Sequence, residues 1–574
     1  EGPRTTIDRV TISGSTHFKA KELRAYVGGP TSSAFGLGAL YFVEVEANRA
    51  LSSIESLYYH SGFLDVRIEG PEPTFSADRK EVQLTLHVSE GTRYLVQEIT
   101  VENQDPDHAQ ALEEVFARYR SKPFYPRITR EIQSVCSGYL ANTGYADASV
   151  QALEAIDAQT GLVSIQLQVQ LGPIVHIDSI EVSGNRKTRT GFILGALELK
   201  PGDRYSQAAE RRSFQSLYAS GLFSSVRMKL SGAGTQRTLE IEVQEAPTLS
   251  TSVEVGYGAF ERSRIILGLS ERSIFGTGRS LTLEAKLAEK ARGAELFFSD
   301  PYTIDSDHVL GATAFIEERE QVSFDQQELG LGVNLQHTLT RNYRQIYGHE
   351  YRISEASNSE IVIPSATTDL QNDVRISALY ITNVYDTRDT FFLPREGSRL
   401  RFRSEIAGAG LGSELSFMRF DGRFSHYVPF ENDQQLAFAI RGGLIVPTEG
   451  TQFIPLQERF FNGGQDTVRS FREDELGPTD ANGNPIGGEV YSVFSLEYRR
   501  TLFGTFSAAL FADAGNVELA HTDFLKLKDL RYGVGPGVRW LLPIGPLRLD
   551  WGINPKPRPG EEEWVLQFSL GVAF

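Results

Sequence analysis

Two hydrophobic periodicities divide the chain near residue 248. Before that point, short alternating strands are interleaved with segments in which apolar side chains recur every three to four residues, the spacing of a helix buried on one side. After it the helical spacing ceases, and alternating segments separated by Gly, Asn, Asp and Pro continue to the last residue. The pattern therefore predicts small α+β domains followed by one large all-β domain.

The first part of the chain repeats one unit three times. Each unit begins with a strand, continues with two helical segments and ends with two strands, and each second helix is followed by a glycine junction. In the third unit the helical spacing predicts that Phe214, Leu217 and Tyr218 form the buried face of the second helix. The junctions are SGFLDVRI (61–68), TGYADASV (143–150) and SGLFSSVR (220–227), and the predicted domains are 1–91, 92–172 and 173–247.

The second part, residues 248–574, alternates apolar and charged side chains. In RLRFRSEIAG, Leu400, Phe402 and Ile406 share one face of a strand and three arginines and a glutamate share the other. So many charges per strand are too many for a dry core, but they fit a membrane barrel with a wet lumen. At roughly 20 residues per strand and turn, the length predicts a barrel of about 16 antiparallel strands. A lumen of that width needs a plug, which we expect from an inward-folded loop around 460–490.

Composition agrees with a strand-rich envelope protein. The chain contains 53 glycines, 22 tyrosines and 35 phenylalanines but only 2 methionines, which favours strands and turns over helices. The net charge of −17 disfavours a nucleic-acid ligand. No apolar stretch is long enough for a transmembrane helix, and EGPRTTIDRV has no signal-peptide pattern. The single cysteine, Cys136, shares a helical face with Ile128 and Ile132, which predicts a small buried thiol.

Candidate chemistry is sparse. The sequence contains no nucleophile–base motif, no histidine pair with metal-ligand spacing and no nucleotide loop, so we predict neither an enzyme nor a cofactor nor a metal site. In YDTRDTFFLPREG (385–397) a metal site is conceivable, but the turn chemistry favours a tight hairpin. The residues of this hairpin motif are Asp386, Arg388, Asp389, Pro394 and Gly397.

The repeat order and its G-(L/F)-F-x-x-V junction resemble the POTRA domain. The whole chain is similar to the superfamily of POTRA-barrel outer-membrane translocases and insertases, which includes BamA, TamA and the two-partner secretion transporters. The resemblance rests on RFFNGG followed by Val468-Arg469-Ser470-Phe471, where the family has a VRGF motif, and on the stretches YDTRDTFFLPREG, SLEY, FADAG and GPLRLDWG. It implies that Arg469 of the inward loop pairs with carboxylates of the barrel wall.

By this resemblance the wall partners of Arg469 are Glu497 in SLEY and Asp513 in FADAG. Two carboxylates around one planar guanidinium are physically plausible, because the fork of donors can be held from both sides. Ser470 departs from the family glycine and puts the loop geometry in question, since serine tolerates a positive φ less well.

The resemblance also implies a place and a role. The protein is expected in the outer membrane of a Gram-negative bacterium, with its repeats in the periplasm; a plastid envelope is the alternative. Three repeats and a compact barrel are most similar to TamA, which implies autotransporter or other unfolded outer-membrane clients and an inner-membrane-anchored TamB-like partner. A BamA-like general insertase and a passive or two-partner-type secretion channel are the alternatives.

The mechanism expected of such a barrel uses its seam. The first strand (251–260) and the last strand (564–574) meet there, and glycines weaken their pairing. An opened seam offers a free edge to an incoming client strand. The seam candidates are Val253, Val255, Gly256, Gly258, Phe568, Gly571 and Phe574.

Overall fold

The chain folds into two compact units. The computed structural model describes residues 5–570, apart from 28–40, 103–105, 305–306, 359–360, 362–372, 392, 431–432, 525, 527–528 and 543–544. One unit contains the repeats (1–186 and 190–245), and the other contains the barrel (187–189 and 246–574).

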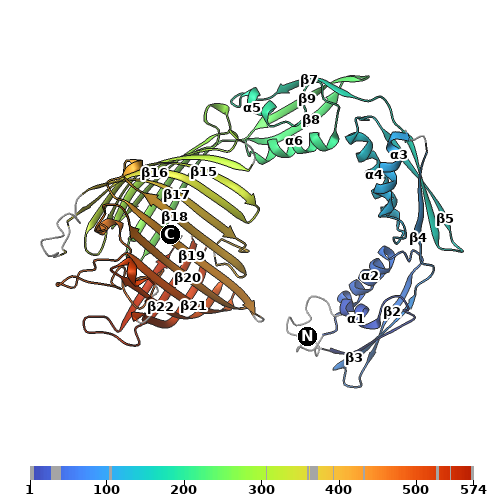
Figure 1. Ribbon diagram of the computed structural model, residues 1–574. Helices are drawn as coiled ribbons and strands as arrows, with labels where there is room; N and C mark the ends of the chain where they lie inside the picture. The colour runs from blue at the N-terminus through green and yellow to red at the C-terminus, as the bar shows by residue number, and fades with distance from the viewer. Residues whose placement is uncertain are drawn as a thin grey trace. The chain divides into compact units, whose positions relative to one another are not determined.

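Each repeat is a three-stranded sheet with two helices (Figure 1). The last strand of each repeat lies in the centre of its sheet, parallel to the first strand and antiparallel to the second. Repeat 1 comprises β1 (Thr6–Ser13), α1 (Ala20–Val27), α2 (Glu44–His60), β2 (Arg67–Phe75) and β3 (Glu81–Ser89). Repeat 2 comprises β4 (Leu95–Glu102), α3 (Pro106–Ala117), α4 (Pro126–Asn142), β5 (Ser149–Asp157) and β6 (Leu162–Gln170). Repeat 3 comprises β7 (His176–Ser183), α5 (Thr190–Gly195), α6 (Gln207–Ala219), β8 (Phe223–Ser231) and β9 (Gln236–Glu245).

The central strands carry the cores of the repeats. On β3, Val82, Leu84 and Leu86 are buried while the residues between them are exposed. The glycine after each second helix has a positive φ, of 97° at Gly62, 94° at Gly144 and 67° at Gly221, so the same left-handed turn leads into the second strand of every repeat. Three POTRA-type repeats are therefore present, as predicted. Their exact limits remain predictions, since the repeats pack in one unit.

Two sequence expectations about helices had different outcomes. The burial of Cys136 is confirmed, because its side chain is fully enclosed in the core of repeat 2. The predicted inner face of α6 is wrong for Phe214 and Tyr218, which are exposed and stack on each other at 5.9 Å. The buried face is Ala209, Ser213 and Leu217, because two small residues four positions apart allow the helix to approach its sheet.

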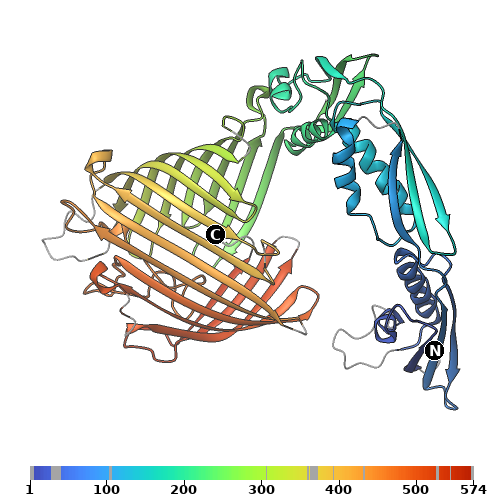
Figure 2. The ribbon, with the colours of Figure 1, turned by 45° about the vertical axis from the view of Figure 1, so that its right-hand side comes forward.

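The second unit is a closed antiparallel barrel, and within the described residues it has 16 strands, as predicted (Figure 2). No helix in the described ranges is long and apolar enough to cross a bilayer. The described connections contain the short 3₁₀ helices η1 (Ile274–Gly276), η3 (Ala409–Leu411), η4 (Leu456–Glu458) and η5 (His521–Asp523). The strands are β10 (Leu249–Gly258), β11 (Arg262–Glu271), β12 (Ser280–Ala288), β13 (Ala291–Asp300), β14 (His308–Glu320), β15 (Asp325–Thr340), β16 (Tyr343–Ser357), β17 (Val374–Asp386), β18 (Gly397–Ala407), β19 (Phe417–Phe430), β20 (Gln434–Pro447), β21 (Val490–Phe503), β22 (Phe506–Glu518), β23 (Arg531–Leu542), β24 (Gly545–Ile553) and β25 (Trp564–Leu570).

The outer surface of the barrel is apolar. Large hydrophobic side chains at alternate positions, such as Leu329, Leu331 and Val333 on β15, point away from the lumen and are 54%, 61% and 54% exposed. The inward positions carry buried charges, among them Glu405, Asp513 and Arg539. An exposed apolar belt around a charged interior is stable only when lipid surrounds the belt.

Candidate functional site

The long connection between β20 and β21, residues 448–489, is held inside the barrel. Its buried apolar residues Ile454, Leu456, Val468, Phe471 and Leu476 pack against inward side chains of the wall. The two arms of this inward loop also pair with each other, through bridges from Phe460 to Gly488 and from Asn462 to Leu476. The loop is therefore an ordered part of the lumen.

Arg469 lies at the centre of the loop's contact with the wall. Its Nε and Nη2 donate to the two carboxylate oxygens of Asp513 on β22, both at 2.7 Å, and its Nη1 donates to Glu497 Oε2 on β21 at 2.8 Å. The guanidinium carbon also lies 3.6 Å from the centre of the Phe511 ring. The structure thus brings Arg469, Glu497 and Asp513 together in a buried, bidentate arrangement. Their role in fixing the loop remains a prediction.

The wall continues this charge network beyond the residues that the sequence singled out. Asp550 on β24 is fully buried 3.6 Å from Arg469 Nη1, and Arg539 on β23 joins Glu497 and Asp550 at 2.7 Å each. Arg548 Nε donates to Asp550 at 2.6 Å. The alternation of GPLRLDWG places Arg548 and Asp550 on the lumen face, which is the signal that would have found them.

The remaining motif residues also contact the barrel wall. Val468 and Phe471 are buried in an apolar cluster with wall residues, and Ser470 donates its hydroxyl to the carbonyl of Tyr532 at 2.9 Å. Ser470 is not among the described residues with positive φ, so serine causes no backbone strain here. The wall leaves space for the Ser470 side chain because residue 533 is glycine. A Cβ at Gly533 would lie 2.7 Å from Ser470 Oγ.

The hairpin motif forms the turn between β17 and β18. Arg388 donates to both oxygens of Asp386, at 2.9 and 2.8 Å, and Asp389 accepts from the backbone amide of Arg395 at 2.9 Å. Gly397 has a positive φ of 98°. The backbone carbonyl of Pro394 accepts a hydrogen bond from the side-chain amide of Gln435 at 2.6 Å. Within the described residues no group of histidine, cysteine, aspartate and glutamate side chains is arranged to hold a metal ion.

The seam joins β10 and β25, the first and last strands of the barrel. In the described chain, which ends at Leu570, Tyr257 pairs with Leu570 and Gly258 with Ser569. By contrast, β10 pairs with β11 along its whole length. Phe568 contacts Tyr257 with ring centres 5.6 Å apart, whereas Val253 and Val255 are exposed and Gly256 lies against the carbonyl of Leu570. Gly571 and Phe574 lie outside the described residues.

The inward loop also contacts the last strand of the seam. Gln567 on β25 is buried and donates its side-chain amide to the carbonyl of Phe471, two residues after Arg469, at 2.9 Å. On the neighbouring β24, a Cβ at Gly552 would lie 2.1 Å from the Arg469 carbonyl, so glycine is required for this close approach. The arginine site and the seam are therefore joined through two residues of loop backbone.

Comparison with known proteins identifies the family. The model of the Omp85 superfamily domain matches residues 273–574, and a POTRA model, described as a surface antigen variable number repeat, matches 5–91 and 175–246. The chain belongs to the Omp85 superfamily. It is an outer-membrane β-barrel protein with periplasmic POTRA repeats.

Several of the similar curated proteins are named BamA. The outer membrane protein assembly factor BamA of Nitratidesulfovibrio vulgaris is 25% identical over 100% of this chain and 74% of its own length, and that of Neisseria meningitidis is 23% identical over 93% and 73%. Among solved structures, BamA from Haemophilus ducreyi lacking POTRA domains 1–3 matches with a TM-score of 0.73 at 18% identity, covering 83% of this chain and 99% of that one. This last likeness shows the fold.

These relatives correct the assignment to the TamA branch. That assignment rested on the number of repeats, but a chain that aligns with about three quarters of a BamA sequence cannot be assigned to a branch by counting them. BamA is the better match. The TamB-like partner was expected only with the TamA branch and loses its support with it.

Proposed function

We propose that the protein is a BamA-like insertase, which receives unfolded outer-membrane proteins on its periplasmic repeats and inserts them through the seam between β10 and β25. The observation that carries this proposal is the meeting of the first and last barrel strands: among the described residues, which end at Leu570, β10 pairs with β25 at Tyr257 and Gly258, and it pairs with β11 along its whole length.

Opening the seam would have a direct energetic consequence. Unpaired backbone groups facing lipid cost several kcal/mol each, because no water is present to replace the missing partner. An incoming strand that pairs with β10 removes this cost for both chains, so the exposed edge acts as a template for client strands. The proposed reaction makes and breaks hydrogen bonds only, and the folding free energy of the client drives it.

The repeats supply edges of the same kind outside the membrane. Within the described residues, the second strand of each repeat (β2, β5 or β8) lies at an edge of its sheet and pairs with the central strand, whereas the first strand also forms a bridge to a loop residue, as Thr6 does to Tyr41. An extended client segment can add to such an edge through main-chain hydrogen bonds. These bonds depend little on the client's side chains, so they suit clients of many sequences.

The proposal is tested by locking the seam. In a Cys136→Ser background, Gly258→Cys and Ser569→Cys place two thiols at directly paired positions, and a Cβ at Gly258 meets no other atom within 4 Å. Oxidation should stop insertion of a barrel client into proteoliposomes, and reduction should restore it. The matched control is the pair Val253→Cys and Leu267→Cys across β10 and β11, which is already closed. Full insertion by the locked protein would refute lateral opening and favour a passive channel.

A further inference from the structure

The inward loop has a second buried charge contact, made by Glu458 in η4. Arg352 on β16 donates Nη2 to Glu458 Oε2 at 2.8 Å, and Arg419 on β19 donates Nη2 to the same oxygen at 2.7 Å. Arg419 also donates to the backbone carbonyl of Glu458 at 2.5 Å. The Glu458 side chain is only 2% exposed. A carboxylate this enclosed needs both cations to offset its desolvation.

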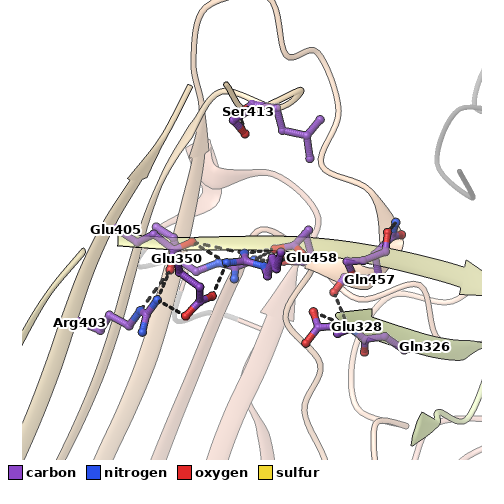
Figure 3. Close-up of polar contacts among 12 residues, drawn as sticks. Gln326, Glu328, Glu350, Arg403, Glu405, Ser413, Gln457 and Glu458 are labelled. Atoms are coloured by element: carbon purple, nitrogen blue, oxygen red, sulfur yellow. Dashed lines mark hydrogen bonds and ion pairs between the residues drawn. The ribbon is translucent and has the colours of Figure 1, made fainter. Parts of the chain in front are cut away.

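The wall arginines are themselves held in place. Arg352 pairs with Glu350 at 2.9 Å and with Glu405 at 3.3 Å, and Arg403 pairs with Glu405 at 3.0 Å (Figure 3). These residues form a chain of alternating charges across β16 and β18, to which the loop adds its own carboxylate. The wall partner of Glu458 is therefore preorganised.

Neighbouring contacts hold the same segment of the loop. Gln326 on β15 donates to the Gln457 carbonyl at 3.3 Å, and Gln457 donates to the Ser354 carbonyl at 3.4 Å. Four residues before Glu458, Ile454 is 1% exposed and packs against apolar residues of β17 to β20. The contact at Glu458 is thus the charged centre of a docked segment.

The two charged contacts of the loop have opposite signs and different partners. At Arg469 a loop cation meets wall carboxylates on β21, β22 and β24, whereas at Glu458 a loop anion meets wall cations on β16 and β19. A loop docked in the wrong place would bring like charges together in a buried site, which costs more than either correct pairing gains. The sign difference therefore fixes the orientation of the loop.

We propose that Glu458 is a second anchor of the inward loop, and that with Arg469 it holds the loop as a brace between the β16–β19 and β21–β24 parts of the barrel wall. Glu458 is a positioning residue: it touches no client in this scheme but holds the segment that leads to Arg469. A cavity of about 510 Å³ borders Glu458, Arg352 and Arg419, so a released loop segment has space to move into. This proposal concerns the loop's position and does not depend on insertase activity.

Its test measures the loop at each anchor separately. In the full-length Cys136→Ser protein in lipid nanodiscs, Ile454→Cys reports on the second anchor and Val468→Cys, at a position with 0% exposure, reports on the first. Glu458→Gln should raise the maleimide-labelling rate at position 454 about tenfold or more, because local opening exposes the thiol, and should raise it less at 468. Arg469→Gln should show the opposite order. The control is Glu449→Gln, an exposed glutamate of the same loop, which should change neither rate.

Charge exchange separates direct pairing from a general loss of order. Glu458→Arg and Arg419→Glu should each increase labelling at position 454, and the double variant should label more slowly than either single variant. Only protein that shows the heat-modifiable gel mobility of a folded barrel is compared. If a charge-reversal variant does not fold, Glu458→Gln takes its place as the test of the anchor. Unchanged labelling in Glu458→Gln, or a double variant no better than the singles, would overturn the proposal, whatever the outcome of the seam-locking experiment.

Discussion

The repeats and the barrel use the same strand alternation in opposite senses. On β3 of repeat 1, Leu84 and Leu86 point into a closed core and the residues between them face water. On β15 of the barrel, Leu329 and Leu331 point outward and the residues between them face the lumen. Since a period of two residues is common to both, the surroundings of the sheet decide which face is the inside. Four substitutions and conditions test this difference, in order of decreasing expected effect.

The largest effect is expected from a charge in the core of a repeat. Leu84→Lys buries an ammonium group in the apolar core of repeat 1 and should destabilise the repeat by about 5 kcal/mol or more, enough to unfold it. Hydrogen–deuterium exchange of β1, β2 and β3 measures this in the full chain. Thr85→Lys, on the exposed face of the same strand, should leave exchange unchanged. Equal protection in both variants would mean that the core described here does not stabilise the repeat.

Inside the barrel, by contrast, the buried charge of Arg469 has partners of opposite sign. Arg469→Asp places a third acid beside Glu497 and Asp513 and should lower barrel stability by about 3–5 kcal/mol. Urea titration in detergent, read by heat-modifiable mobility, measures the loss. Arg472→Asp, whose salt bridge to Glu562 is exposed on both sides, should cost under about 1 kcal/mol.

The double variant that combines Arg469→Asp with Asp513→Arg should recover part of the stability that each single variant loses. The new arginine still faces Glu497 and Asp550 across the same buried space. A double variant as unstable as the worse single variant, with both folded, would remove Asp513 as the partner of Arg469.

A charge on the outer face of the barrel should have an intermediate effect. Leu331→Arg puts a guanidinium toward lipid and should cost about 2–4 kcal/mol in a bilayer. Asn334→Arg lies on the lumen face of the same strand, near the acidic side chains of Glu284 and Glu295, and should cost under about 1 kcal/mol. Folding equilibria in phospholipid vesicles distinguish the two. The reverse order would show that the faces have been assigned the wrong way round.

The smallest effect concerns the thiol in repeat 2. Burial raises the pKa of the Cys136 thiol from 9.0 to about 11. Between these pH values the thiol is protonated in the folded repeat and deprotonated in the unfolded chain. Repeat 2 should therefore lose stability as pH rises from 9 to 11, by about 1 kcal/mol near pH 10, and Cys136→Ala should remove this part of the pH dependence. Rapid labelling of native Cys136 by iodoacetamide at pH 8 would contradict its burial.

Sequence reasoning succeeded where a period or a motif carried the information. The strand order of the repeats followed from the two hydrophobic periodicities, and the number of barrel strands followed from the length of the second part. The contact of Arg469 with Glu497 and Asp513 was expected from family-like stretches, and the anchoring role of these residues stays a prediction. It failed at Phe214 and Tyr218, because side-chain size suggested a buried face that small residues in fact provide.

Glu458 was missed for a different physical reason. It lies close to the motif in LQERFFNGG, but its partners Arg352 and Arg419 come from strands far away in the chain. The path of the loop through the lumen decides which inward arginines it meets, and no local pattern encodes that path. The seam likewise depends on barrel closure, which sets how far β10 and β25 overlap.

The hydrogen bond from Gln567 to the Phe471 carbonyl has a thermodynamic consequence for recognition. If the docked loop favours one arrangement of β25, then a closed β25 must favour the docked loop by the same coupling free energy, since linkage is reciprocal. We expect an antibody fragment raised against the docked loop to bind more tightly when the Gly258→Cys/Ser569→Cys disulfide is formed than when it is reduced. Equal affinities in the two states would show that the last strand and the loop move independently.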